Sequence, residues 1–219
     1  MVIELEGVSK SLKGRTVLDE ITLTCPSRAV VGLWGPNGSG KTMLMRVISG
    51  LVKASSGSVC VEGRDLTRGG VFPPSLGVMI ESPAFLDHRT GFDNLRLLAA
   101  IRGTASDADL AQALESVGLP LQDRRKFRAY SLGMRQRLGL AAATMESPHL
   151  VLLDEPTNAL DVSGVEMVRA LVEKQRDEGA TVVLSSHDKA FLESVANVVW
   201  MMEEGRIVGR WNHGKELCV

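Results

Sequence analysis

Residues 35–42 read Gly35-Pro36-Asn37-Gly38-Ser39-Gly40-Lys41-Thr42 and fit the pattern G-x-x-x-x-G-K-[ST] of a phosphate-binding loop. The apolar run at residues 29–34 predicts a buried strand before the loop. The apolar positions between residues 43 and 48, followed by Gly50, predict a helix after it. Strand, loop and helix together are the context in which this pattern binds phosphate. The stretch therefore predicts an α/β fold with a nucleotide site beside its first buried strand.

The residue types of the loop suit a compact, highly charged anion. Glycines let the backbone wrap closely and point N–H groups inward, and the following helix directs its positive end to the same place. The pattern predicts that Lys41 reaches the β- and γ-phosphates and that the Thr42 hydroxyl binds Mg²⁺. A glycine-rich turn that binds nothing is the alternative, and the coincidence of strand, Lys-Thr pair and helix argues against it.

Composition sets outer bounds on the function. The 219 residues are 44% hydrophobic and 23% charged, which suits one globular domain over residues 1–219. The net charge of -1 gives no electrostatic reason to expect a nucleic acid partner. Cys25, Cys60 and Cys218 are widely spaced and read as free thiols. Without a signal peptide pattern or a run of about 20 apolar residues, we expect a cytoplasmic chain.

Hydrophobic periodicity divides the chain into three kinds of structure. Alternating stretches predict antiparallel strands of a small β-subdomain, at residues 2–8, 17–24 and 58–61. Continuous apolar runs predict buried strands of a mostly parallel sheet, at residues 76–80, 150–155 and 181–185. Helical spacing between about residues 85 and 146 predicts a helical subdomain inserted into that sheet. Later segments predict helices at 165–175 and 189–195, and a hairpin with strands at 198–202 and 207–211.

Two carboxylates and a histidine follow the buried strands. Asp154 and Glu155 end one strand and His187 follows the next, so all three are expected at the edge that also holds the phosphate loop. One carboxylate can support Mg²⁺ and the other can deprotonate the attacking water, while the histidine can contact the γ-phosphate. The simpler readings are a solvated acidic pair and a structural histidine. The phosphate loop upstream favours the catalytic reading.

Five stretches in sequence order resemble the motifs of ATP-binding cassette (ABC) transporter ATPases, over nearly the whole chain. Tyr130-Ser131-Leu132-Gly133-Met134 resembles the signature usually written L-S-G-G-Q, and Ser131 is also a natural helix N-cap. The other four are the phosphate loop, residues 150–158, Ala159-Leu160-Asp161 and Ser186-His187. The resemblance implies an α/β fold with a P-loop NTPase core of the RecA-like type.

The resemblance also implies a mechanism. Two cassettes, identical or related, pair head to tail, and each ATP lies between one chain's phosphate loop and the other chain's signature helix. It implies that Lys41 is catalytic, that Thr42 and Asp154 hold Mg²⁺, and that Glu155 is the general base for water. The remaining implied roles are γ-phosphate sensing by His187, a link between the two sites by Asp161, and contact with the partner's ATP by Ser131, Leu132, Gly133 and Met134.

Two positions depart from the family pattern. The family usually carries an aromatic residue that stacks on adenine near position 12, where this chain has Leu12. An apolar contact without π-stacking predicts weak discrimination between ATP and GTP. Glu81 replaces a glutamine that normally touches Mg²⁺ and moves with the membrane partner. Together with the signature stretch, Glu81 resembles the bacitracin-type and lantibiotic-immunity exporter ATPases, and we interpret it as a coupling residue that also faces the metal.

Three functions fit these features to different degrees. The first is the ATPase subunit of a peptide antibiotic or drug exporter, peripheral on the cytoplasmic face of the membrane through a separate transmembrane permease. The second is the ATPase of an importer, or of a system that moves lipid or haem precursors. The third is a soluble ABC protein without a transport role, which usually has two cassettes or a coiled-coil insertion. Glu81 and the single cassette favour the exporter.

Overall fold

The computed structural model of the protein describes residues 1–212 and 215–217, the last three by their backbone alone. Cys218 lies outside the described residues. A small antiparallel sheet has the strand order β2-β1-β4-β5. Lys13 and Gly14 have φ values of 47° and 80°, the geometry of a two-residue hairpin turn between β1 and β2. The strands are β1 (Ile3–Leu12), β2 (Arg15–Cys25), β4 (Ser56–Val61) and β5 (Arg64–Asp65).

The central sheet has the order β11-β10-β9-β3-β8-β7-β6. Pairing from β6 through β7, β8 and β3 to β9 is parallel, and β10 and β11 continue the sheet antiparallel. The fully buried strand β7 fits its place inside a sheet covered on both faces. The strands are β3 (Val30–Trp34), β6 (Leu76–Met79), β7 (Leu150–Leu153), β8 (Thr181–Ser186), β9 (Val198–Glu203), β10 (Arg206–Asn212) and β11 (Lys215–Leu217).

Alternate residues of the central strands point to two separate hydrophobic cores. Val31 and Leu152 face the core shared with helix α1 (Lys41–Ile48) and the small sheet. Val30 and Val151 face the second core, which includes side chains of α5 (Val162–Asp177), α6 (Lys189–Val195) and the inserted helices. The period of two along each strand thus fixes the phosphate loop's helix on one face and α5 and α6 on the other.

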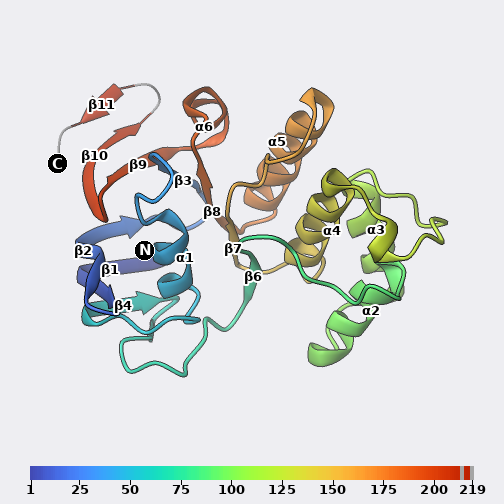
Figure 1. Ribbon diagram of the computed structural model, residues 1–219, viewed down its shortest axis with the longest axis horizontal. Helices are drawn as coiled ribbons and strands as arrows, with labels where there is room; N and C mark the ends of the chain where they lie inside the picture. The colour runs from blue at the N-terminus through green and yellow to red at the C-terminus, as the bar shows by residue number, and fades with distance from the viewer. Residues whose placement is uncertain (213–214, 218–219) are drawn as a thin grey trace.

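The segment between β6 and β7 is mainly helical. Figure 1 shows its helices gathered at the end of the molecule away from β1, β2 and β4. Capping boxes at Thr90 with Asp93 and at Ser106 with Asp109 start the first two helices. The elements are α2 (Gly91–Arg102), α3 (Asp107–Ser116), the short 3₁₀ helix η1 (Phe127–Ala129) and α4 (Leu132–Thr144).

Some element boundaries differ from the sequence prediction for local physical reasons. The strand predicted at residues 150–155 ends at Leu153, because Glu155 has a φ of 47° and cannot continue an extended ladder. The helix predicted from residue 165 begins at Val162, because Asp161 caps it by accepting a hydrogen bond from the backbone of Gly164. Strand β1 runs to Leu12, past bulges that break its alternation after Leu5.

Candidate active site

The phosphate loop joins β3 to α1 in a shape that its glycines permit. A Cβ on Gly35 would lie 2.2 Å from the carbonyl oxygen of Met202, so a larger residue does not fit there. The Lys41 ammonium donates hydrogen bonds to the carbonyls of Gly35 at 2.7 Å and Pro36 at 3.1 Å. The buried Ser39 hydroxyl has no hydrogen-bond partner among the described residues. A buried hydroxyl without a partner and a buried ammonium in one loop are groups that an anion would satisfy.

Asp154 lies at the centre of a hydrogen-bonded chain of oxygen atoms. Its Oδ2 accepts a bond from the Thr42 hydroxyl at 2.7 Å, and its Oδ1 accepts one from the Ser185 hydroxyl at 2.6 Å. Ser185 in turn accepts a bond from the backbone N–H of Glu155 at 2.9 Å. Hydroxyl and carboxylate oxygens are the ligands that Mg²⁺ prefers, with phosphate and water oxygens filling the remaining positions. Thr42 and Asp154 therefore fit a Mg²⁺ ion bound together with a nucleotide.

Glu155 and His187 form a pair beside Lys41. Glu155 Oε2 lies 3.0 Å from His187 Nδ1, and its Oε1 lies 3.8 Å from the Lys41 ammonium. Oε1 is buried and accepts no hydrogen bond from the described residues. A buried carboxylate oxygen without a donor can take a hydrogen bond from a water molecule at little cost. The geometry suits a general base that a histidine orients.

Gln136 connects α4 to this catalytic edge. Its side-chain amide is buried and donates to the carbonyls of Glu155 at 3.1 Å and Pro156 at 3.2 Å. The φ of 47° at Glu155 is uncommon for a residue other than glycine, and these two bonds help hold it. A shift of α4 would therefore reach the backbone of the proposed base.

The signature stretch lies at the start of α4, apart from the phosphate loop of its own chain. Ser131 is the N-cap and accepts a bond from the Met134 N–H at 3.2 Å, and Leu132 is 66% exposed. A Cβ on Gly133 would lie 3.1 Å from the Ala159 carbonyl oxygen. A cavity of about 320 Å³ beside the phosphate loop is lined by Lys41, Thr42, Asp154 and Glu155 among others, but by none of residues 131–134.

The two predicted coupling residues, Glu81 and Asp161, lie in different parts of the structure. Glu81 has a φ of 61° and forms a 2.6 Å ion pair with Arg46 of α1, and both side chains line the cavity beside the phosphate loop. Asp161 caps α5 and lies 3.9 Å from Arg137 of α4. The hydrogen bond from the Gly164 backbone holds the pKa of Asp161 below its usual range, so the cap is ionised at neutral pH.

Leu12 is the last residue of β1 and is 43% exposed. It does not line the cavity beside the phosphate loop, whereas Val17 of β2 does. We predict that the chain hydrolyses GTP at a rate within about tenfold of the ATP rate, because neither aliphatic side chain offers π-stacking to a purine. Initial rates with the two nucleotides at equal concentration measure this. A GTP rate tenfold or more below the ATP rate would contradict it.

Three residues contribute to this site although the sequence pattern predicts no role in it for them. Ser185 is predicted only as the end of a buried strand, but the register that pairs Leu153 with Leu184 brings its hydroxyl beside Asp154. A polar residue that ends an apolar strand is the signal that could have found it. No sequence pattern marks Gln136 or Arg46 as part of the site, because a polar residue in a helix normally faces solvent.

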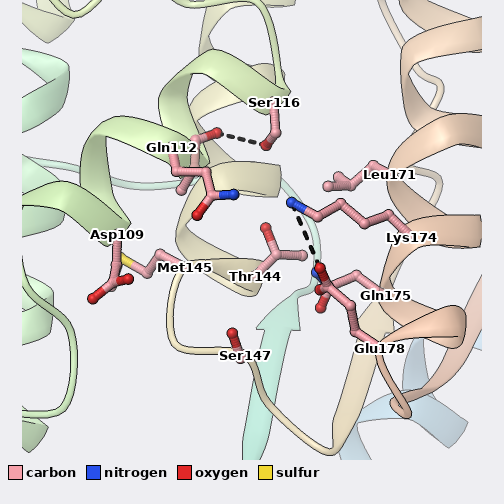
Figure 2. Close-up of a pocket in the computed structure, with 11 residues that line it drawn as sticks. Asp109, Gln112, Ser116, Thr144, Met145, Ser147, Leu171, Lys174, Gln175 and Glu178 are labelled. Carbon is pink, nitrogen blue, oxygen red and sulfur yellow. Dashed lines mark hydrogen bonds and ion pairs between the residues drawn. The ribbon is translucent and has the colours of Figure 1, made fainter.

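A separate polar cavity of about 70 Å³ lies between the inserted helices α3 and α4 and helix α5 (Figure 2). Lys174 and Glu178 of α5 form an ion pair of 3.7 Å at its rim. Its lining contains none of the predicted site residues. It marks a polar contact between the inserted segment and the core.

The fold places Thr42, Asp154 and Glu155 beside the phosphate loop at one edge of a parallel sheet, which is the arrangement of a phosphate-loop nucleotide hydrolase. Residues 18–158 match the ABC transporter family, to which the chain therefore belongs. This confirms the predicted resemblance, the P-loop NTPase fold and ATPase activity. The family uses Mg²⁺ together with ATP. No described helix of the chain is both long and apolar enough to cross a membrane.

Three curated relatives match most of the chain. An uncharacterized ABC transporter ATP-binding protein of Bacillus subtilis, YybJ, is 40% identical over 206 residues, which are 94% of each protein. The lantibiotic transport ATP-binding protein SrtF of Streptococcus pyogenes is 35% identical over 94% of this chain and 89% of its own length. The bacitracin transport ATP-binding protein BcrA of Enterococcus faecalis is 39% identical over 96% of this chain and 69% of its own.

Solved cassettes share the fold at lower sequence identity. The ATP-binding cassette MJ0796, in a dimeric post-hydrolysis structure bound to ADP and Pi, superposes with a TM-score of 0.88 at 22% identity. The match covers 97% of this chain and 99% of that one. The ATP-binding subunit of another ABC transporter gives a TM-score of 0.87 at 24% identity. At these identities the likeness establishes the fold.

Proposed function

We propose that this chain is the ATP-hydrolysing subunit of an exporter for a peptide antibiotic or a similar amphipathic compound, and that it powers a separate membrane permease. The placement of Glu155 carries the hydrolytic part of the proposal, because one oxygen lies toward His187 and the other, near Lys41, accepts no hydrogen bond from the residues that the structure describes. The transport relatives SrtF and BcrA support the export part. Residues 1–219 act as one cassette, with residues 85–146 as its helical subdomain.

Hydrolysis proceeds at a site that two cassettes complete. Lys41 and the loop N–H groups bind the phosphates, and Thr42 and Asp154 would hold a Mg²⁺ ion that would neutralise charge on the phosphates. Glu155 takes a proton from the attacking water, while His187 orients this carboxylate and contacts the γ-phosphate. Ser131 and Gly133 of a second cassette, which is another copy or a related chain, close over the nucleotide with the N-terminus of α4.

An apolar groove of about 330 Å³ supports a permease partner. It is lined by the segment after β6, by α2 and by α4, through side chains that include Ile80, Pro83, Phe85 and Leu98. Leu98 is 39% exposed, and the neighbouring Leu97 and Ile101 are 44% and 80% exposed. Exposed apolar patches of this kind mark interaction sites. In our proposal a cytoplasmic helix of the permease occupies the groove, which keeps the cassette at the membrane.

Antibiotic resistance tests the transport function. The chain is expressed in a sensitive bacterium together with a membrane permease that co-purifies with it, and the minimal inhibitory concentration of bacitracin and of a lantibiotic is measured. We expect a rise of about fourfold or more with the wild-type chain and none with Glu155→Gln, because export needs hydrolysis. An equal rise with both chains would refute the proposal.

Glu81 is the residue we assign to coupling between hydrolysis and the permease. It lies between Ile80 and Ser82, which line the apolar groove, and it also lines the cavity that holds Lys41 and Thr42. We predict that Glu81→Ala lowers ATP turnover about three- to tenfold and abolishes the resistance, because it removes the partner of Arg46 and a charge from the cavity where Thr42 and Asp154 would hold the metal.

Glu20→Ala is the matched control for this variant. Glu20 is also exposed and also has a positive φ, of 52°, but it lies on the small sheet. It should retain wild-type turnover and resistance. If Glu81→Ala left both ATP turnover and resistance unchanged, the coupling role would be disproved.

A further inference from the structure

The residue before the phosphate loop is a tryptophan that contacts the segment carrying His187. Trp34 is the last residue of β3, and its indole N–H donates a hydrogen bond to the backbone carbonyl of His187 at 3.3 Å. The two residues are 153 positions apart in the chain. Gly35 follows Trp34 directly. One rigid side chain therefore connects the phosphate loop to the His187 loop.

A second tryptophan and a lysine hold the Trp34 ring in place. The Trp34 ring packs edge-on against Trp211 of β10, with 5.8 Å between centroids and 68° between planes. The ammonium of Lys189 lies 5.0 Å from the centroid of the Trp211 ring. Lys189 begins α6, two residues after His187. Edge-on aromatic pairs and cation–π contacts both favour a fixed geometry, so the tryptophans brace the His187 loop from β3 and from β10.

The His187 side chain has little packing of its own. It is 61% exposed, and its imidazole Nδ1 lies 3.0 Å from Glu155 Oε2. An exposed imidazole takes its position from the backbone that carries it. On one side of that backbone Asp188 donates its N–H to the Ser186 hydroxyl at 3.0 Å. At the His187 carbonyl, the Trp34 indole adds a contact from 153 positions away in the chain.

We propose that Trp34 is a positioning residue for His187, and that it transmits movements of the phosphate loop to the Glu155–His187 pair when nucleotide binds. A shift of Gly35 rotates or translates the indole beside it, and the hydrogen bond carries that shift to the His187 carbonyl. The inference rests on the proposed roles of Glu155 and His187 in hydrolysis. It adds a residue that does not line the cavity beside the phosphate loop.

Steady-state kinetics of tryptophan variants give the first test. Trp34→Phe keeps an aromatic ring against Trp211 and removes the N–H donor, so kcat should fall about five- to tenfold while KM stays within about twofold. Trp34→Leu, which also removes the ring, should lower kcat further. Trp200→Phe makes the same chemical change on β9, where the ring is buried and contacts Arg210, and should keep the wild-type kcat. Equal kcat for Trp34→Phe and Trp200→Phe would overturn the proposal.

A double-mutant cycle with His187→Ala gives the second test, with binding of a fluorescent ATP analogue as the check that every variant is folded. If Trp34 acts through His187, adding Trp34→Phe to His187→Ala changes kcat by less than about twofold. If the kcat losses of the two single variants multiply in the double variant, Trp34 has a general structural role and the inference is overturned. A loss of kcat in His187→Ala alone would still support the proposed function. If His187→Ala alone kept the wild-type kcat, His187 would have no role in hydrolysis. That result would disprove this part of the proposed function, and the inference about Trp34 as well.

Discussion

Glu155→Gln should lower ATP turnover by about 100-fold or more, the range expected when a general base is removed. Glutamine keeps the shape of the side chain and can still contact His187 Nδ1. It cannot take the proton of the attacking water. Since the Lys41, Thr42 and Asp154 contacts remain, we expect ATP affinity within about threefold of wild type. Phosphate release and binding of a fluorescent ATP analogue measure the two effects separately.

Glu204→Gln is the control for this loss. Glu204 is exposed, has a φ of 46° like Glu155, and lies in the turn between β9 and β10. The same chemical change there should leave turnover unaltered. Retention of half or more of the wild-type rate by Glu155→Gln would show that another group removes the proton. A loss of ATP binding in the same variant would instead show that the carboxylate holds the nucleotide.

Ser131→Arg should abolish hydrolysis, with a loss of about 100-fold or more, while a single chain keeps its ATP affinity. The signature serine does not line the cavity that holds Lys41 and Thr42 in its own chain, so binding there is independent of it. In the proposed dimer the arginine occupies the place of the partner's γ-phosphate. The measurement is phosphate release at chain concentrations above and below the dimerisation range, together with ATP-analogue binding.

Ser106→Arg provides a closely matched control, because both serines are helix N-caps. Ser131 caps α4 and Ser106 caps α3, and each accepts a hydrogen bond from the third residue of its helix. Each variant therefore loses a cap, which costs about 0.5–2 kcal/mol of stability. Hydrolysis should survive in Ser106→Arg. Equal loss of turnover in both variants would mean that capping, and not contact with ATP, explains the effect of Ser131.

The sequence predicted those parts of the fold that local patterns determine. Continuous apolarity predicts a buried strand at residues 150–155, where the structure has β7, and helical spacing between about residues 85 and 146 predicts the inserted helices, α2 among them. The antiparallel start of the chain followed from alternation, although bulges near Val8 hid the last part of β1. In each case the signal lies within a few neighbouring residues.

The contacts that sequence reasoning missed join residues far apart in the chain. Arg46 and Glu81 pair across the cavity beside the phosphate loop, and the Trp34 indole reaches the carbonyl of His187. Neither contact has a period or a spacing that could reveal it. The prediction that Glu81 faces Mg²⁺ stays a prediction, and the structure adds that one of its carboxylate oxygens pairs with Arg46.

The central claim is that one chain's phosphate loop works with another chain's signature helix, and mixing two inactive variants tests it most directly. Lys41→Ala disables the loop and Ser131→Arg disables the signature. An equimolar mixture forms dimers of which half contain one of each chain, and each such dimer has one intact site. We expect turnover to recover to roughly a quarter of the wild-type rate, as a symmetric dimer with independent sites requires. The wild-type chain, measured alone under the same conditions, must be active. If the mixture of the two variants then shows no recovery of ATP turnover, the account is contradicted.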